Sequence, residues 1–118
     1  MLTEDSQISY VRADLQALKS LNELFCEVFD EPDNYHGATP SDEYLKTLLV
    51  DKGFIPLAAV TNDAIVGGLA AYVLKKFEQE RSEIYIYDLA VREQYWRRGI
   101  ATGLINKLRE IARELGHG

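Results

Sequence analysis

The sequence has one cysteine, few prolines and no long apolar run, and these scarcities exclude whole classes of protein. Cys26, its one cysteine, cannot form a disulfide within the chain, which excludes the disulfide-rich scaffolds. No stretch approaches the ~18 consecutive apolar residues of a membrane-spanning helix. Residues 1–10 carry acids where a secretory signal peptide carries bases, and they lack its apolar core. These absences favour a cytoplasmic protein that does not act at a membrane.

What is present is ordinary for a folded domain. The chain has 118 residues, of which 47% are apolar and 27% charged. Length and composition of this kind are typical of one compact unit rather than of a disordered segment. We therefore expect a single domain over residues 1–118.

Positive charge is scarce in the first part of the chain. The net charge is −6, and no Lys or Arg lies between Lys19 and Lys46. Seven acids fall in that stretch: Glu23, Glu27, Asp30, Glu31, Asp33, Asp42 and Glu43. Their sign argues against a nucleic-acid partner, because such binding rests on neutralising phosphates. It suits the attraction of a polycation, and it equally suits a solvated acidic face.

Apolar spacing in the first half predicts a strand followed by two helices. Residues 7–12 alternate between apolar and polar, as a half-buried strand does. Apolar residues at intervals of three and four predict an amphipathic helix over 14–30. A second helix is expected to begin at Thr39, with Pro40 at its first position and Asp42 completing a capping box.

The second half predicts three strands and a helix. Two apolar runs, 54–60 and 65–74, flank a tight polar turn and predict a hairpin. Residues 83–91 are apolar on both faces and rich in β-branched and aromatic side chains, which predicts a central strand. The clearest helical pattern covers 101–115. The expected order is β-α-α-β-β-β-α, an α/β fold.

The loop before the last helix carries the strongest chemical signal. A helix N-terminus offers backbone N–H groups without helical partners and the positive end of the helix dipole. Gly99 allows close approach of a ligand, and Arg97 and Arg98 add charge that matches phosphate geometry. The segment is therefore suited to a pyrophosphate. An ordinary glycine turn with exposed arginines has the same local sequence.

The run Trp96-Arg97-Arg98-Gly99-Ile100-Ala101 resembles motif A of the GNAT acyltransferases, which is usually written Gln/Arg-x-x-Gly-x-Gly/Ala. The glycine and the alanine match, whereas Trp96 stands where the family has Gln or Arg. The resemblance implies a mixed, mainly antiparallel sheet flanked by helices, and acetyl-CoA as co-substrate. It places the pantetheine, the thioester oxygen and the pyrophosphate on Leu89, Ala90, Val91, Arg97, Arg98, Gly99, Ile100, Ala101 and Thr102.

Longer runs, at 69–74, 76–79, 81–91 and 99–102, are similar to aminoglycoside 3-N-acetyltransferases of the gentamicin-resistance type. This resemblance implies transfer of an acetyl group to the 3-amino group of a 2-deoxystreptamine aminoglycoside, by direct attack in a ternary complex. The acceptor would be a cationic small molecule. An acetyltransferase for a polyamine or a protein N-terminus is an alternative.

Two acids on the strand 83–91 are the candidate catalytic residues. Asp88 closes the apolar part of the strand, where it could bind a cationic amine or accept its proton if burial raised its pKa. Glu83 opens the same strand and is the second candidate. For both, the alternative is a carboxylate that neighbouring groups or solvent satisfy. Tyr85 and Tyr87, which alternate with isoleucines, are expected to pack in the core; the alternative is that one of them edges the acceptor cleft.

Three further features carry weaker expectations. Cys26 falls on the apolar face of the first helix and is expected to be buried and inert. Gly67 and Gly68 inside a strand predict a bulge or a close backbone approach. His36 and His117 have no neighbours at metal-ligand spacing, so no metal site is expected.

The resemblance also implies a missing part. In the family the chain continues past the position of Gly118 into a further strand, a helix and closing strands, and in many members a tyrosine there protonates the leaving thiolate. This sequence would lack those C-terminal elements and leave one edge of the strand 83–91 open. We therefore expect a homodimer formed at that edge. A non-catalytic remnant or a dimerising module is the alternative to an enzyme.

Overall fold

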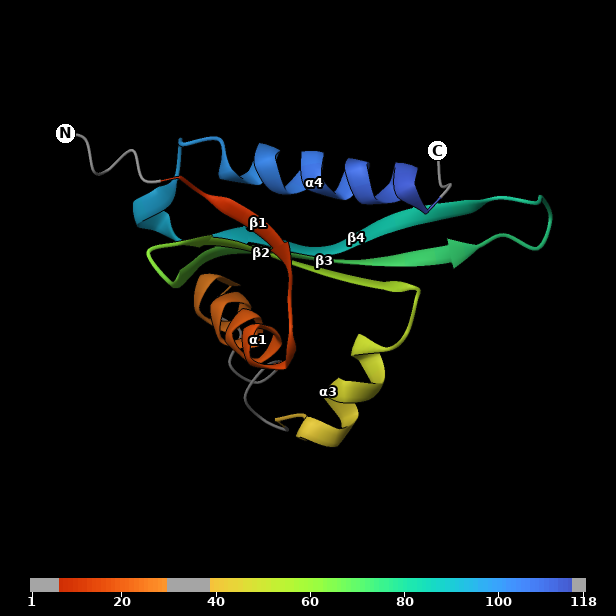
Figure 1. Cartoon of the computed structure of the whole chain (residues 1–118), viewed down its shortest axis with the longest axis horizontal. Coiled ribbons are helices and arrows are strands. Elements are labelled where there is room, and N and C mark those ends of the chain that lie inside the picture. The colour runs from red at the N-terminus through yellow and green to blue at the C-terminus, as the bar shows by residue number, and fades with distance from the viewer. Residues whose placement is uncertain (1–6, 30–38, 116–118) are drawn as a thin grey trace.

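The computed structural model describes residues 7–29 and 39–115, which form a four-stranded antiparallel sheet with helices on both faces (Figure 1). The strands lie in the order β1-β2-β3-β4. The elements in chain order are β1 (Ser9–Arg12), α1 (Leu15–Phe29), α3 (Asp42–Leu49), β2 (Phe54–Thr61), β3 (Ala64–Lys75), β4 (Ser82–Val91), the 3-10 turn η2 (Glu93–Tyr95) and α4 (Ile100–Glu114). The predicted order and the α/β class are confirmed. No helix within the described residues is long and apolar enough to cross a membrane.

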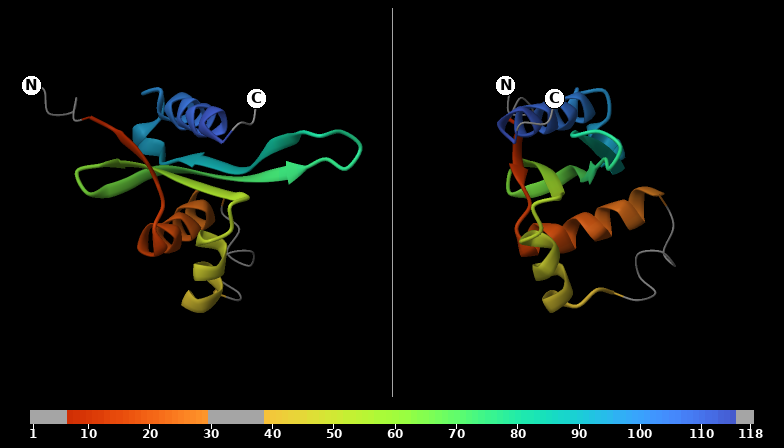
Figure 2. Two further views of the ribbon diagram at one scale, coloured as in Figure 1. Left: turned by 45° about the vertical axis from the view of Figure 1, so that its right-hand side comes forward. Right: turned by 90° about the vertical axis from the view of Figure 1, so that its right-hand side faces the viewer.

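The helices divide between the two faces of the sheet. Helix α4 covers one face, whereas α1 and α3 lie against the other (Figure 2). Because side chains alternate along a strand, β2, β3 and β4 each supply both cores. The core under α4 includes Leu57, Leu69 and Leu104. The core under α1 includes Leu21 and Ala70. Cys26 of α1 is buried, which confirms the prediction of its burial.

Glycines in β3 allow the helices to come close to the sheet. A Cβ atom on Gly68 would lie 2.2 Å from Cδ2 of the buried Leu21 in α1. A Cβ on Gly67 would lie 3.2 Å from Cγ2 of Ile100, the first residue of α4. The predicted close approach is therefore confirmed on both faces. A register shift between Ala59 and Val60 of β2 confirms the irregular pairing as well.

The predicted hairpin of β2 and β3 is confirmed, and its loop has two residues, because Thr61 belongs to β2. Asn62 and Asp63 have φ values of 52° and 63°. Two successive left-handed residues are typical of the type I′ turn, whose twist matches that of the strands. Asn and Asp tolerate this conformation better than other residues with side chains.

Two predictions about elements are wrong. Helix α3 begins at Asp42, and its N-cap is Ser41 rather than Thr39; the Ser41 hydroxyl accepts a hydrogen bond from the Tyr44 N–H at 3.1 Å. The extended ψ of 158° at Ser41 lets its short side chain reach back to that donor. The residue pattern predicted a central strand for β4, but β4 is an edge strand of the described sheet, with the open edge that the resemblance implied.

The position of β4 also corrects the prediction for its tyrosines. Tyr85 and Tyr87 are 57% and 66% exposed instead of being packed in the core. A strand at an edge buries less of each face than a central strand, because no neighbour covers one side of its side chains. The expected end of the first helix near Asp30 and the stop at Gly116 lie outside the described residues.

We predict that Gly68→Ala lowers the free energy of unfolding by about 1–3 kcal/mol, because the added methyl overpacks the core against Leu21. Urea denaturation measures the change. In a Leu21→Ala background the same substitution should cost much less, since the clashing atoms are gone. Equal costs in the two backgrounds would show that this contact does not limit the approach of α1.

Candidate functional site

The N-terminus of α4 has the geometry of an anion site. Gly99 is the N-cap, with a φ of 76°, and no side chain caps the helix. The first helical hydrogen bond runs from the Gly103 N–H to the Gly99 carbonyl at 2.9 Å. The backbone N–H groups of Ile100, Ala101 and Thr102 precede that bond and have no carbonyl of the helix to bind. They are available to a ligand, together with the positive end of the helix dipole.

Two arginines lie beside these N–H groups. Arg97 and Arg98 are exposed, and neither forms an ion pair with another residue of the described part of the chain. The Arg98 guanidinium lies 5.2 Å from the ring centroid of Tyr95, which holds it near the helix start. Arg97 has a φ of 67°, a left-handed conformation that is costly for a residue with a side chain. Such backbone outliers often cluster at functional sites.

Trp96 connects this loop to the end of β4. Its indole Nε1–H donates to the Val91 carbonyl at 2.7 Å, while the side chain remains 56% exposed. The bond spans the turn η2 and sets the distance between the last residue of β4 and the first turn of α4. This contact gives the tryptophan a structural role at the position where motif A usually has Gln or Arg.

The hydrogen-bond ladder determines which backbone groups of β4 face its open edge. The Arg92 N–H donates to the Val66 carbonyl at 2.8 Å. Bonded and non-bonded pairs alternate in an antiparallel ladder, so Ala90 and Asp88 also bond to β3. Leu89 and Val91 then point their N–H and C=O groups outward, away from β3. These two residues are among those that the resemblance assigns to pantetheine.

A β-bulge interrupts β4 just before these residues. Ala70 pairs with Asp88 but Ala71 pairs with Ile86, so Tyr87 is an extra residue in β4. Asp88 shares the face of its partner Ala70, which packs in the core under α1. The Tyr87 ring contacts that of Tyr72, with centroids 6.0 Å apart and planes at 84°, on the same face. The bulge therefore presents Tyr87 and Asp88 side by side toward α1 and α3.

Asp88 has an aromatic environment. Burial raises the pKa of the Tyr72 phenol, and the nearby Asp88 carboxylate raises that pKa further, with smaller effects from Tyr44 and Tyr87. The direction follows from charge, because a phenolate beside a carboxylate would be repelled. Tyr72 thus stays neutral at physiological pH. Asp88 itself is half-buried.

Glu83, the second candidate acid, lies elsewhere. Its carboxylate is 2.9 Å from the Arg81 guanidinium and 3.9 Å from the Lys76 ammonium. Five residues of strand separate it from Asp88, which corresponds to about 15 Å. The structure therefore does not bring the two predicted acids together.

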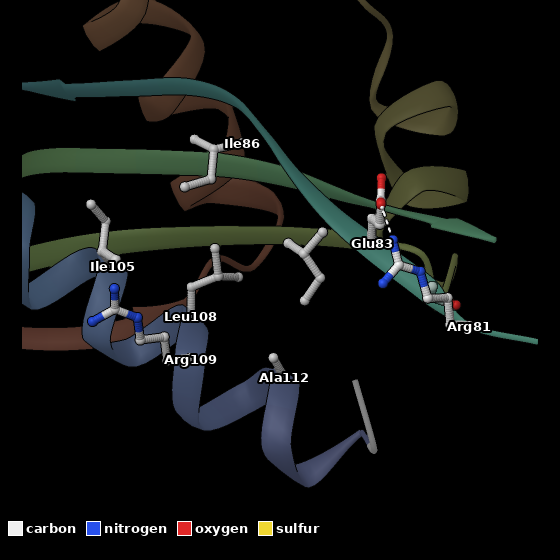
Figure 3. Close-up of a pocket in the computed structure, with 9 residues that line it drawn as sticks. Arg81, Glu83, Ile86, Ile105, Leu108, Arg109 and Ala112 are labelled. Atoms are coloured by element: carbon white, nitrogen blue, oxygen red, sulfur yellow. Dashed lines mark hydrogen bonds and ion pairs between the residues drawn. The ribbon is translucent and has the colours of Figure 1, made fainter. Parts of the chain in front are cut away.

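Sequence reasoning missed a groove between β4 and α4. It has a volume of about 580 Å³, and Figure 3 shows Arg81 and Glu83 at one end of it. Its apolar lining comes from Ile84, Ile86, Ile105, Leu108 and Ala112. The isoleucines of β4 and the apolar stripe of α4 were visible in the sequence. The open edge of β4 was implied by the resemblance, but the groove that these side chains form beside α4 was not predicted.

The acidic stretch between Lys19 and Lys46 is partly engaged in ion pairs. Glu27 pairs with the Arg92 guanidinium, and Asp42 lies 3.1 Å from the Lys19 ammonium. Asp30, Glu31 and Asp33 lie outside the described residues, as do His36 and His117. Within residues 7–29 and 39–115, no three His, Cys, Asp or Glu side chains gather as metal ligands would.

The outward backbone groups of β4 join a cationic helix N-terminus to a carboxylate. That arrangement is suited to an extended ligand with phosphate at one end and a reactive group at the other. The comparison with known families is specific. The chain belongs to the acetyltransferase (GNAT) family, whose description matches residues 18–118. This family generally uses acetyl-CoA.

Two solved structures of aminoglycoside acetyltransferases from uncultured soil metagenomic samples are similar to the chain. One is 46% identical, with a TM-score of 0.89 over 94% of this chain and 75% of its own. The other, in complex with sisomicin, is 32% identical, with a TM-score of 0.84 over 99% of this chain and 76% of its own. The chain shares its fold with a ribosomal-protein-alanine N-acetyltransferase from Brucella melitensis biovar Abortus 2308. That protein is 21% identical, with a TM-score of 0.70 over 95% of this chain and 76% of its own. A comparison with curated protein sequences gave no significant match.

We predict that the double substitution Arg97→Ala/Arg98→Ala weakens CoA binding at least about tenfold, because each charge-assisted contact to phosphate is worth roughly 1.5–3 kcal/mol. Calorimetry with CoA measures the change. Arg109→Ala/Arg113→Ala removes the same charge from the far part of α4 and should leave the affinity nearly unchanged. Equal losses in the two double variants would point to net charge instead of local contact.

Proposed function

We propose that this chain is a single N-acetyltransferase domain over residues 1–118 that transfers the acetyl group of acetyl-CoA to an amine of a cationic aminoglycoside in the cytoplasm. The observation that carries the proposal is the continuity of the site along β4. Arg97 and Arg98 lie beyond the strand, the outward groups of Leu89 and Val91 follow, and Asp88 comes next. Similarity to two aminoglycoside acetyltransferases supports the class of acceptor.

Acetyl-CoA, the co-substrate, would supply the activated thioester. In the proposal its pyrophosphate lies on the N–H groups of Ile100, Ala101 and Thr102, between the two arginines. Its pantetheine arm follows the open edge at Val91 and Leu89. From Val91 to Asp88 the strand rises about 10 Å, so the edge leads toward the carboxylate. In the proposal acetyl-CoA thus binds the backbone groups, and the acceptor amine binds Asp88.

The acceptor amine would approach from the face of α1 and α3, where Asp88 lies. Asp88 binds the ammonium and accepts a proton, which leaves a nitrogen lone pair for attack on the thioester carbon. An N–C bond forms and the C–S bond breaks, and CoA leaves as a thiolate that takes up, through water, the second proton that the nitrogen loses as the amide forms. An outward N–H of β4 stabilises the oxyanion formed between these two events. Both reactants are held at once, so no acyl-enzyme is needed.

The acceptor prediction concerns Asp88. Asp88→Asn should weaken sisomicin binding or turnover about tenfold, because a charge-assisted contact is lost, and should leave CoA affinity unchanged. The wild-type affinity for sisomicin should fall with added salt, since exposed charges are screened over ~8–10 Å. Thiol release from acetyl-CoA, with mass spectrometry of the product, measures transfer.

Glu83→Gln is the matched variant, since it removes one charge from the same strand. The proposal expects nearly normal transfer, because Glu83 is paired with Arg81 and Lys76. A large loss in Glu83→Gln with a fully active Asp88→Asn would move the catalytic role to Glu83. A salt-independent affinity together with an active Asp88→Asn would remove the aminoglycoside from the proposal. Transfer to spermidine in its place would favour a polyamine acceptor.

We also propose that this 118-residue chain forms homodimers through the part of β4 that precedes the bulge. The Lys76 N–H bonds to the Arg81 carbonyl, so the ladder turns the backbone groups of Ile84 outward. Ile86 is 37% exposed beside them. An open edge of this kind pairs readily with a second copy.

We predict a solution mass of twice the 13.4 kDa chain mass in light scattering at micromolar concentration. Ile86→Lys should return the protein to a monomer, because a charge on the edge opposes strand pairing. Full transfer activity in that monomer would show that the dimer is dispensable for catalysis. A stable wild-type monomer would overturn the proposed dimer and leave the proposed chemistry untouched.

A further inference from the structure

A row of aromatic rings crosses the sheet on the side of α1 and α3. The ring of Phe54 in β2 stacks on that of Tyr72 in β3, with centroids 5.2 Å apart and planes at 30°. Tyr72 in turn meets the edge of Tyr87 in β4. We call Phe54, Tyr72 and Tyr87 the aromatic row. It runs from the buried core outward, since Phe54 is 5% and Tyr87 66% exposed.

The outer end of the aromatic row adjoins the Asp88 carboxylate. Tyr87 and Asp88 are consecutive residues that the bulge turns to the same face. Tyr72 lies close enough to Asp88 and to Tyr44 of α3 for both to raise the pKa of its phenol. Tyr44 is 56% exposed. A carboxylate therefore lies beside aromatic surface that reaches the solvent.

This combination is more than the packing of the core requires. An exposed tyrosine ring on an edge strand offers apolar surface that a ligand can cover. Aromatic faces attract cations within about 6 Å of the ring centre, and a large rigid ring offers contact area at little cost in conformational entropy. A carboxylate alone would bind any ammonium. Rings beside it add a preference for an ammonium that is carried on a bulky apolar frame.

We propose that Tyr72 and Tyr87 form a contact wall for the acceptor, against which a ring bearing the reactive amine lies while Asp88 holds its ammonium. The inference rests on the proposed function and names the residues that set its acceptor specificity. The wall selects amines carried on rings over amines on flexible linear chains. Phe54 acts behind the wall by holding the orientation of the Tyr72 ring.

Tyr87→Leu is the test variant, because Tyr87 is exposed and its removal leaves the core intact. Calorimetry with sisomicin should show about two- to fivefold weaker binding, while CoA affinity stays unchanged. The affinity for spermidine, a linear polyamine, should fall less in the same variant. Phe77→Leu, at the fully exposed tip of the β3–β4 hairpin, is the matched control and should alter neither affinity. Tyr72→Phe, which keeps the ring, should bind sisomicin as tightly as the wild type does. Tyr72→Leu should bind sisomicin more weakly.

Salt separates the wall from the carboxylate. The loss caused by Tyr87→Leu should persist at high ionic strength, whereas the loss caused by Asp88→Asn should shrink as charges are screened. Unchanged sisomicin affinity in Tyr87→Leu, with a wild type that binds and acetylates sisomicin, would overturn the wall alone. A wild type that binds CoA but not sisomicin would overturn the wall and the proposed acceptor together. Equal losses for sisomicin and spermidine would overturn the preference for rings.

Discussion

The extra residue that β4 carries at Tyr87 is the constraint on which the site depends. Before the bulge, the even-numbered residues of β4 turn their backbone groups to the open edge; after it, the odd-numbered ones do. One inserted residue therefore turns the backbone groups of Leu89 and Val91 outward, where Trp96 bonds to the Val91 carbonyl. It also puts two consecutive side chains, Tyr87 and Asp88, on the face of α1 and α3. A regular strand would have sent one of them to the opposite side.

The rest of the architecture holds β4 and α4 in register with that bulge. Trp96 bonds to the last carbonyl of the strand, and Arg92 joins the same end to α1 through Glu27 and to β3 through the Ile65 carbonyl. Gly67 admits Ile100, so the first turn of α4 packs directly on the sheet. The cationic loop thus has little freedom to move away from the strand edge. The left-handed backbone of Arg97 is strained, and this strain accompanies the sharp turn of the chain there.

The parts of this protein that local periodicity governs could be predicted from the sequence. The element order, the hairpin turn, the buried Cys26 and the close approach at Gly68 all follow from spacing and residue type. The features that could not be predicted depend on contacts between parts of the chain that are distant in the sequence or on the exact backbone geometry. The residue pattern of β4 predicted a central strand, and only the resemblance implied its open edge, because strand pairing depends on the whole sheet. The N-cap at Ser41 rather than Thr39 depends on backbone angles two residues away. The composition of the strand does not indicate the bulge. The sequence therefore could not predict that Asp88 lies near Tyr72 or that Glu83 lies far from both.

Charge is separated along the strand in a way that suits two substrates of opposite sign. The two arginines that pair with no acid among the described residues lie beyond the C-terminal end of β4, and Asp88 lies about 10 Å before that end. At physiological ionic strength the Debye length is of the same order, so each pole acts mainly on the molecule beside it. A polyanion would therefore bind mainly at the helix N-terminus, and a polycation mainly at Asp88. The strand edge between them is uncharged, and it is there that a neutral acyl group would pass from one to the other.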